Sequence, residues 1–199
     1  TMALLLETIR LENGEYNNLS YHEQRMNRSL KTLCGTEDYF DLEKFISHLE
    51  KPTEGLYKCR ITYDENSQTA EFMPYQPRMV ERLKLVEHNY ITYEFKFSDR
   101  RQLEKLYALR DGCDDILIVK KGLITDTSYA NIVFRRGKQW YTPWDPLLKG
   151  TMRQYLLQWD KVIAEEITLK DLAGFETFKL VNAMLKFDSP EMDIKNILK

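Results

Sequence analysis

The 199-residue chain has few cysteines and no surplus of basic residues. Cys34, Cys59 and Cys113 are odd in number and widely spaced, and they form no Cys-x-x-Cys pair. This pattern argues against a disulfide framework or a zinc site and is typical of a protein from the reducing cytoplasm. The 29 Lys and Arg residues are balanced by 31 Asp and Glu residues, so the formal net charge is −2. This balance indicates neither a nucleic-acid partner nor an anionic membrane surface.

Long apolar runs and nucleotide-binding motifs are also missing. The apolar run 3–6 is followed at once by Glu7, so we expect neither a signal peptide nor a membrane span. The sequence contains no Gly-x-Gly-x-x-Gly fingerprint and no phosphate loop. With 43% hydrophobic residues, the chain can bury an ordinary core in one domain or in two small lobes.

Apolar patterning predicts many short strands with helices between them. The expected strands cover 5–11, 57–63, 69–73, 116–119, 123–125, 132–135, 139–141, 162–167 and 176–181, and the stretch 91–97 is also β-rich. Runs of strands with interspersed helices favour an α+β fold. Pro74 and Pro77 interrupt the pattern, so we place a lobe boundary within 74–82. The predicted N-terminal lobe is 1–78 and the predicted C-terminal lobe is 79–199.

Five helices are expected between these strands. The first begins at a capping box, 20–23, and ends near Gly35, and the second covers 41–49. The third begins at Asp99, the fourth follows Gly150, and 168–171 forms a short capped helix. The apolar residues expected on the buried helix faces are Met26, Leu30, Leu33, Leu103, Leu106, Leu109, Met152, Tyr155, Leu156 and Trp159.

A lysine, a carboxylate and a Gly-Thr pair follow one another in a defined order. Lys96 lies in an aromatic segment 30 residues before Asp126 (126 − 96 = 30), and the segment 126–131 ends in asparagine before an apolar strand. The segment 148–153 opens a helix, where backbone N–H groups favour an anion. Taken singly, the three features are a solvated lysine, a polar turn and a capped helix start. Their order and spacing together favour one shared binding site.

This arrangement resembles the class IV, fold-type IV pyridoxal phosphate enzymes, which include aminodeoxychorismate lyase and the branched-chain and D-amino-acid aminotransferases. The resemblance implies a two-lobed α+β fold with pyridoxal 5'-phosphate in the cleft between the lobes. Lys96 would form the imine with the cofactor, and Asp126 would pair with the pyridinium nitrogen. The family normally has glutamate at the position of Asp126, which is one methylene longer. The further cofactor-binding residues that it implies are Arg25, Asn131, Gly150, Thr151, Met152 and Asn182.

Shorter motifs extend the resemblance over most of the chain. His22-x-x-Arg25 is similar to the family's His-x-x-Arg, whose arginine contacts the cofactor phosphate, while His22 itself is expected to be a packed helix residue. The segment 180–184 resembles the Cys-Asn-Ala-Leu-Met segment of the lyase, and 6–10 resembles the family's Phe-Glu-Thr-x-Arg strand. Candidate substrate-binding residues are Thr8, Arg60 and Arg100.

Three hypotheses for the reaction remain open. Lys96-x-x-x-Arg100 resembles the lysine segment of aminodeoxychorismate lyase, which forms para-aminobenzoate and pyruvate in folate biosynthesis. An aminotransferase of the same fold is the second hypothesis, although its members usually carry asparagine and tyrosine after that interval. A non-catalytic dimer is the third, because Asp126 replaces glutamate and the chain begins almost at the 6–10 motif. The resemblance also implies a homodimer acting on a small amino substrate, and no metal ion, nucleic acid or membrane is expected as a partner.

Overall fold

The structure is a computed structural model that describes residues 4–199, and its chain divides into two units. Unit 1 contains the described residues up to Pro77 together with Phe95–Asp99. Unit 2 contains Arg78–Glu94 and Arg100–Lys199. The first division lies within the stretch 74–82 that the prolines indicated. The return of Phe95–Asp99 to unit 1 was not expected from the sequence.

Phe95–Asp99 belongs to unit 1 because its backbone bonds to the start of the first strand. Leu6 N donates to Lys96 O at 2.9 Å, and Ser98 N donates to Leu4 O at 2.8 Å. A single β-bridge joins Leu5 to Phe97. The stretch 91–97 is otherwise irregular, so the β-rich segment expected there is wrong.

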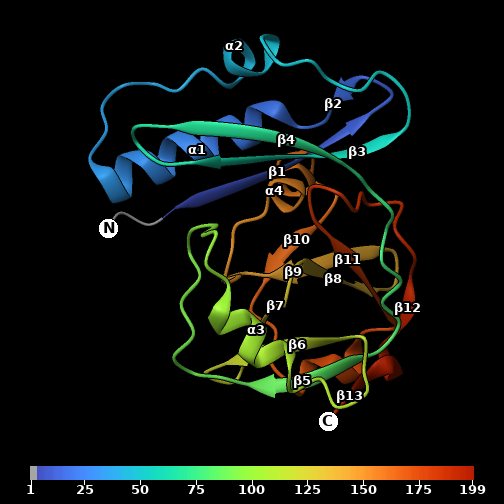
Figure 1. Ribbon diagram of the computed structural model, residues 1–199. Helices are drawn as coiled ribbons and strands as arrows, with labels where there is room; N and C mark the ends of the chain where they lie inside the picture. Colours follow the sequence, from blue (N-terminus) through green and yellow to red (C-terminus); the bar gives the residue numbers. More distant parts are fainter. Residues whose placement is uncertain (1–3) are drawn as a thin grey trace. The chain divides into compact units, whose positions relative to one another are not determined.

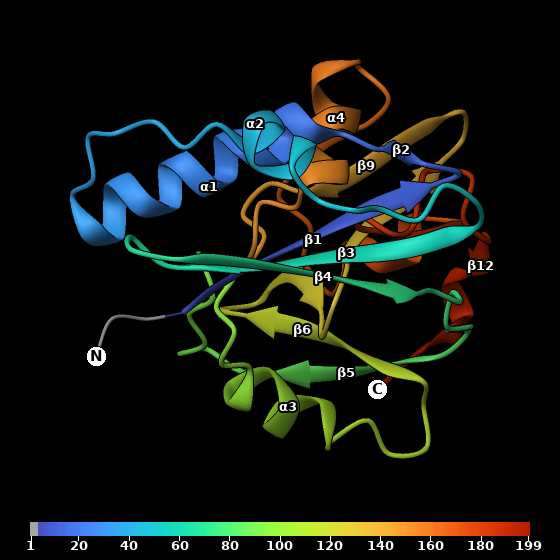
Figure 2. The same cartoon turned by 45° about the horizontal axis from the view of Figure 1, so that its top comes forward.

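Unit 1 is an antiparallel sheet covered on one face by helices. Its strands are β1 (Leu5–Glu12), β2 (Glu15–Tyr16), β3 (Leu56–Tyr63) and β4 (Gln68–Pro74), in the order β2-β1-β3-β4. The helices are α1 (Leu19–Cys34) and α2 (Leu42–Ser47), which lie along the sheet in Figures 1 and 2. Period-two alternation places every second side chain of β1 and β3 on the helix-covered face. The buried core there consists of Leu5, Ile9, Met26, Leu30, Leu42, Ile46, Cys59, Ile61 and Tyr63.

The ends of the first two helices differ in part from the prediction. The helix α1 is capped by Asn18 in a left-handed conformation (φ 55°), so the predicted capping box is wrong. The carboxylate of Glu23 instead accepts hydrogen bonds from Leu42 N at 2.8 Å and from a tyrosine hydroxyl. Gly35 ends α1 with φ 69°, and Asp41 caps α2 through Lys44 N at 2.8 Å, as predicted. Leu33 is 41% exposed and does not join the core.

Unit 2 is built on a nine-stranded mixed sheet. The main path runs β10-β9-β8-β7-β6-β5-β13, and β11 pairs with both β8 and β12. The pairs β5–β6, β9–β10 and β5–β13 are parallel, and the others are antiparallel. The strands are β5 (Leu83–Glu87), β6 (Asp115–Lys120), β7 (Leu123–Thr127), β8 (Asn131–Arg136), β9 (Gln139–Pro143), β10 (Ile163–Glu165), β11 (Thr177–Val181), β12 (Met192–Asp193) and β13 (Ile197–Leu198). The predicted strands of this unit are present, whereas β5, β12 and β13 were not predicted.

The helices of unit 2 are α3 (Arg101–Tyr107), α4 (Thr151–Gln158) and the 3₁₀ helices η1 (Asp171–Gly174) and η2 (Ile194–Asn196). The third helix is shorter than expected, and the short capped helix predicted at 168–171 is wrong, because the 3₁₀ helix there begins only at Asp171. Because α3 begins after Arg100 and ends at Tyr107, Leu109 is 56% exposed, contrary to the prediction. Trp159 follows α4 and is 58% exposed, so it is not on the inner face either. No helix within residues 4–199 is long and apolar enough to span a membrane.

Candidate functional site

The carboxylate of Asp126 is the centre of a buried polar cluster in unit 2. Asp126 is the fourth residue of β7 and is directly opposite Asn131 in β8. Its Oδ1 accepts a hydrogen bond from Asn131 Nδ2 at 2.7 Å, and its Oδ2 accepts one from Leu148 N at 2.9 Å. Asn131 Nδ2 also donates to Leu148 O at 2.9 Å. The turn between two strands and the segment before α4 are thereby fixed to one carboxylate.

Burial changes the acidity of this group. Removal from water raises the pKa of Asp126 from 3.8 to about 6, although the Leu148 and Asn131 hydrogen bonds and the charge of Arg153 oppose the increase. Asp126 is therefore still ionised at neutral pH, with its negative charge only partly compensated. A cationic group that approached this carboxylate would be bound favourably.

Gly150 leaves room for the amide of Asn131. A Cβ atom at position 150 would lie 2.1 Å from Asn131 Oδ1 and 3.2 Å from its Cγ. The backbone of Gly150 (φ −66°, ψ 146°) is accessible to every residue type, so the requirement for glycine comes from the neighbouring side chain. Gly150 caps α4, whose first N–H groups carry the positive end of the helix dipole.

The first turn of α4 is buried and carries a cation. Thr151 is 2% exposed, Met152 is 5% exposed and packs against Val133, and Arg153 is 3% exposed. Arg153 Nη2 donates to the carbonyl oxygens of Pro143 (2.8 Å) and Trp144 (3.3 Å). The guanidinium thus joins the end of β9 to the start of α4, and its charge also lowers the pKa of Asp126.

The turn from Asp126 to Asn131 is held by two further predicted site residues. Arg100 Nη2 donates to Ser128 O at 2.6 Å, and Asn182 Nδ2 donates to Tyr129 O at 3.3 Å. The Asn182 side-chain oxygen accepts hydrogen bonds from the backbone N–H groups of the two residues Met184 and Leu185. Unit 2 therefore brings Arg100, Asp126, Asn131 and Asn182 into one hydrogen-bonded region, and Gly150 lies against the Asn131 side chain.

Unit 1 contains a second buried polar cluster, centred on Glu7 of β1. Glu7 and His22 are 0% exposed and Arg25 is 6% exposed. The Arg25 Nε and Nη2 atoms bind the two Glu7 oxygens at 2.7 and 2.5 Å, and His22 Nδ1 lies 2.6 Å from Glu7 Oε2. A bidentate pair of this kind fixes the plane of the guanidinium. His22 is a packed helix residue, as predicted, and Glu7 orients Arg25.

The charges of this cluster are strongly coupled. Burial alone would raise the pKa of Glu7, but the Arg25 charge and the hydrogen bonds from His22 and Arg25 lower it to about 2. Burial lowers the pKa of His22, and the charges of Arg25 and Lys96 lower it further, against the opposing effect of Glu7. Lys96 is half-buried in the loop that bonds to Leu6, and not at a strand end as predicted. Lys96 and Arg25 thus belong to the same electrostatic region of unit 1.

The two predicted substrate-binding residues of unit 1 lie beside each other. Thr8 of β1 and Arg60 of β3 are cross-strand partners, and Arg60 is in turn opposite Glu71 of β4. Arg60 Nη1 donates to Glu71 Oε1 at 3.0 Å. Since residues opposite each other share a face, these three side chains form a polar row on the face of the sheet that does not carry Ile9 and Ile61.

Comparison with known proteins identifies the family. The family model for class IV amino-transferases matches residues 4–187. The chain belongs to the class IV aminotransferase family. An uncharacterized protein from Haemophilus influenzae (strain Rd) is 37% identical over 186 residues, which are 92% of this chain and 98% of that protein.

Solved structures of class IV proteins have the same fold. A protein from Haemophilus somnus 129pt, provisionally named 4-amino-4-deoxychorismate lyase, is 41% identical with a TM-score of 0.86; the match covers 92% of this chain and 97% of that one. The branched-chain amino acid aminotransferase from Escherichia coli is 12% identical with a TM-score of 0.71, covering 92% and 74% of the two chains. The expected family and the expected mixed fold are therefore confirmed.

Two polar residues of this class IV chain had been given no role on the sequence. Glu7 belongs to the 6–10 motif, which predicts no role for it, and in the structure it holds both His22 and Arg25. Arg153 closes the 148–153 motif, and its position three residues after Gly150 was the available signal for its burial at the start of α4. Within residues 4–199, no cluster of three or more His, Cys, Asp or Glu side chains is suited to a metal ion.

Proposed function

We propose that the chain is a pyridoxal phosphate-dependent lyase resembling aminodeoxychorismate lyase, which converts aminodeoxychorismate into para-aminobenzoate and pyruvate. Membership of the class IV aminotransferase family makes it an enzyme that uses pyridoxal 5'-phosphate. The observation that carries the lyase assignment is Arg100, four residues after Lys96 and bonded to the carbonyl of Ser128. The name of the Haemophilus somnus protein, 41% identical, supports the same assignment.

The residues of the chain fit this cofactor. A pyridinium nitrogen needs a carboxylate, and Asp126 offers a buried one whose pKa is raised to about 6 by removal from water. Asn131 Nδ2 donates to one oxygen of Asp126 and Leu148 N donates to the other, and a carboxylate oxygen has two lone pairs. A phosphate needs N–H donors, and the backbone N–H groups at the start of α4 supply them. Gly150 caps this helix, and a Cβ atom there would collide with Asn131.

Each residue then has a defined task. Lys96 would attach covalently to the cofactor and, after release by the amino substrate, move a proton at the substrate α-carbon. Asp126 would keep the proton on the ring nitrogen. Arg25 and the amides of Thr151 and Met152 would bind the phosphate, with Asn131 and Asn182 fixing the surrounding backbone. When bound, the cofactor withdraws electrons from the α-carbon and so makes that carbon acidic.

An aminotransferase is the alternative that the family itself favours, because the shared fold also occurs in the Escherichia coli aminotransferase. Release of pyruvate from aminodeoxychorismate without any keto-acid acceptor supports the lyase. Conversion that requires a keto acid supports the aminotransferase. A protein that binds no cofactor would support the non-catalytic hypothesis, which the replacement of glutamate by Asp126 motivated.

The first experiment is a cofactor titration. Purified protein is mixed with pyridoxal phosphate, its visible absorbance is recorded, and borohydride is added before mass mapping of the labelled peptide. We expect a label on Lys96, no label in Lys96→Ala, and a normal label in Lys105→Ala, which removes an exposed lysine of α3. A label that persists in Lys96→Ala would disprove the assignment of the attachment residue.

We also propose that the protein is a cytoplasmic homodimer that serves folate biosynthesis. Three free thiols support a reducing compartment, and burial raises the pKa of Cys59 to about 12, which keeps it unreactive. Light scattering of the purified protein tests the dimer, because it reports the molar mass directly. A mass of one chain, 23.8 kDa, would refute it.

A further inference from the structure

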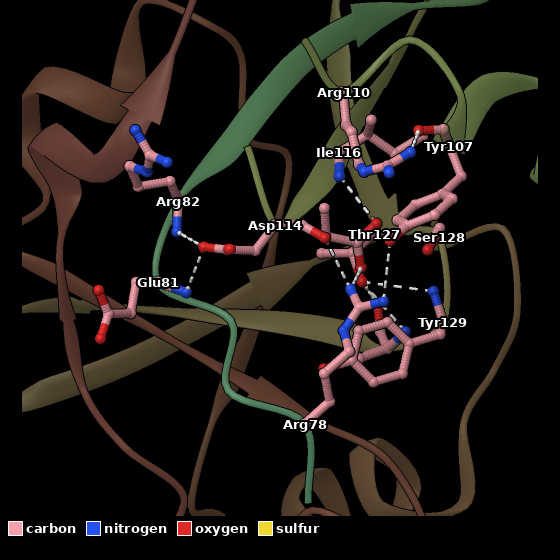
Figure 3. Close-up of polar contacts among 12 residues, drawn as sticks. Arg78, Glu81, Arg82, Tyr107, Arg110, Asp114, Ile116, Thr127, Ser128 and Tyr129 are labelled. Carbon is pink, nitrogen blue, oxygen red and sulfur yellow. Dashed lines mark hydrogen bonds and ion pairs between the residues drawn. The ribbon is translucent and has the colours of Figure 1, made fainter. Parts of the chain in front are cut away.

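Arg78, the first residue of unit 2, is bound from several sides at once. Its Nη2 donates to Asp114 O at 2.8 Å and lies 3.5 Å from Asp115 Oδ2, and its Nη1 donates to the hydroxyl of Tyr107 at 3.1 Å. The guanidinium carbon is 5.1 Å from the centre of the Tyr129 ring and 5.4 Å from that of Tyr107. Figure 3 shows Arg78 extending from the segment before β5 towards Tyr107, Asp114 and Tyr129.

Tyr129 links this cluster to the site. It lies in the turn that separates Asp126 from Asn131, and its carbonyl accepts the hydrogen bond from Asn182. Its ring packs against the core of unit 2, and its N–H points at the Thr127 hydroxyl at 3.5 Å. A movement of the Tyr129 ring would therefore also move the turn that positions the Asp126 carboxylate.

Asp115 supplies the opposite charge. It is 0% exposed at the start of β6, and its Oδ1 accepts a hydrogen bond from Ile116 N at 2.8 Å. Burial raises the pKa of Asp115, whereas the nearby Ser128 and the charge of Arg78 oppose the increase. Arg78 thus compensates a buried carboxylate beside the same turn. Removal of Arg78 would leave that carboxylate without this partner, which is costly in a buried environment.

We propose that Arg78 is a positioning residue of the cofactor site, acting through the Tyr129 ring and Asp115 on the turn between Asp126 and Asn131. The inference rests on the proposed function, because the turn matters only if Asp126 and Asn131 serve the cofactor. Arg78 itself is 46% exposed, so its substitution is compatible with a folded protein. Cation–π contact and a fork of hydrogen bonds both require the guanidinium group.

Arg82 provides a matched control. It is an arginine of the same segment, and its Nη2 donates to a backbone carbonyl, Gly112 O, at 3.0 Å. Like Arg78, it fastens the segment before β5 to the loop before β6. Within residues 4–199, Arg82 bonds to Gly112 and Asp114, whereas Arg78 contacts Tyr107, Asp115 and Tyr129. A purely structural role of the segment would therefore make Arg78→Met and Arg82→Met behave alike.

The test compares Arg78→Met, Arg78→Lys and Arg82→Met by pyridoxal phosphate titration and by amide hydrogen exchange of the cofactor-free protein. We expect Arg78→Met to raise the Kd about tenfold, a size typical of groups that orient a ligating side chain, and to speed exchange across 127–131. Arg78→Lys should recover part of the affinity, because an ammonium also binds a ring face. Arg82→Met should leave the Kd within about twofold of the wild type and the turn unchanged, since it does not contact the Tyr129 ring.

Two outcomes would overturn the inference: unchanged exchange at 127–131 in Arg78→Met, or equal effects of Arg78→Met and Arg82→Met on that turn. If the wild-type protein bound no pyridoxal phosphate, the proposed function would fail. The exchange comparison needs no cofactor and would still decide whether Arg78 holds the turn. A failure of the function is therefore distinguishable from a failure of the positioning role.

Discussion

Substitution of Gly150 by alanine tests the packing at the start of α4. The new Cβ would lie 2.1 Å from Asn131 Oδ1, so the amide of Asn131 must move. This amide is not free to rotate away, because its nitrogen bonds to Asp126 at 2.7 Å and to Leu148 O at 2.9 Å. Alanine at this backbone conformation is otherwise unstrained.

The expected cost follows from these two hydrogen bonds. A neutral hydrogen bond contributes roughly 1 kcal/mol and one to a charged group about 2 kcal/mol. Gly150→Ala should therefore lower the free energy of unfolding by about 3 kcal/mol, the upper range of overpacking effects. Equilibrium unfolding in urea at pH 7 measures this value, and the midpoint of the transition should shift while its slope stays constant.

Two controls isolate the contact with Asn131. Gly174→Ala should change stability by less than about 1 kcal/mol, because no atom lies within 4 Å of its added Cβ. In an Asn131→Ala background, the clash is removed, so Gly150→Ala should cost less than about 1 kcal/mol more. The reasoning is refuted if Gly150→Ala is harmless in the wild type or equally damaging in both backgrounds.

Three other predictions concern the charged residues. Asp126→Ala should reduce turnover far more than stability, and unchanged turnover would mean that another group protonates the cofactor ring. The pKa of Asp126 is raised from 3.8 to about 6, so the folded protein binds this proton more tightly than the unfolded protein does. The resulting contribution to the free energy of unfolding is present below about pH 4 and is lost as pH rises through 6. Urea unfolding of Asp126→Asn at several pH values should not show this loss. The pKa of Glu7 is lowered from 4.5 to about 2, so Glu7 stabilises the fold above pH 4.5, and this contribution of about 3 kcal/mol disappears as pH falls towards 2. The acid loss of stability should be smaller in Glu7→Gln, and an equal loss in both proteins would contradict the assignment.

Local patterning predicted the hairpin strands of both units well. Gly122 lies in the turn between β6 and β7 and Gly137 in the turn between β8 and β9, and neighbouring antiparallel strands need only short connections. β5 was not predicted because its partner β6 is parallel and lies beyond α3, so no local signal connects the two. The stretch 91–94 alternates in burial, with Ile91 and Tyr93 in the interior, yet the backbone of 91–97 forms a β-bridge only at Phe97. The alternation of apolar residues therefore indicates which side chains are buried. It does not show whether another strand is available for the backbone to pair with.

The sequence predicted a set of candidate site residues, but it did not predict which hydrogen bonds they form with one another. Motif spacing placed Asp126 and Asn131 together because they flank one tight turn. The Leu148 amide on Asp126, 22 residues away, depends on the path before α4. The pairing of Glu7 with Arg25 likewise depends on how α1 packs on β1. Side-chain partners across such distances follow from tertiary structure and not from local propensity.

The short return of Phe95–Asp99 to unit 1 has a consequence for biosynthesis. Neither unit is one continuous stretch of chain, because the chain passes from one unit to the other after Pro77, Glu94 and Asp99. As a ribosome releases the polypeptide from its N-terminus, the four-stranded sheet gains its last segment only once residue 99 has emerged. The loop that carries Lys96 is thus the final piece of the first unit, and a nascent chain shorter than this would hold β1 without its partner at Phe97.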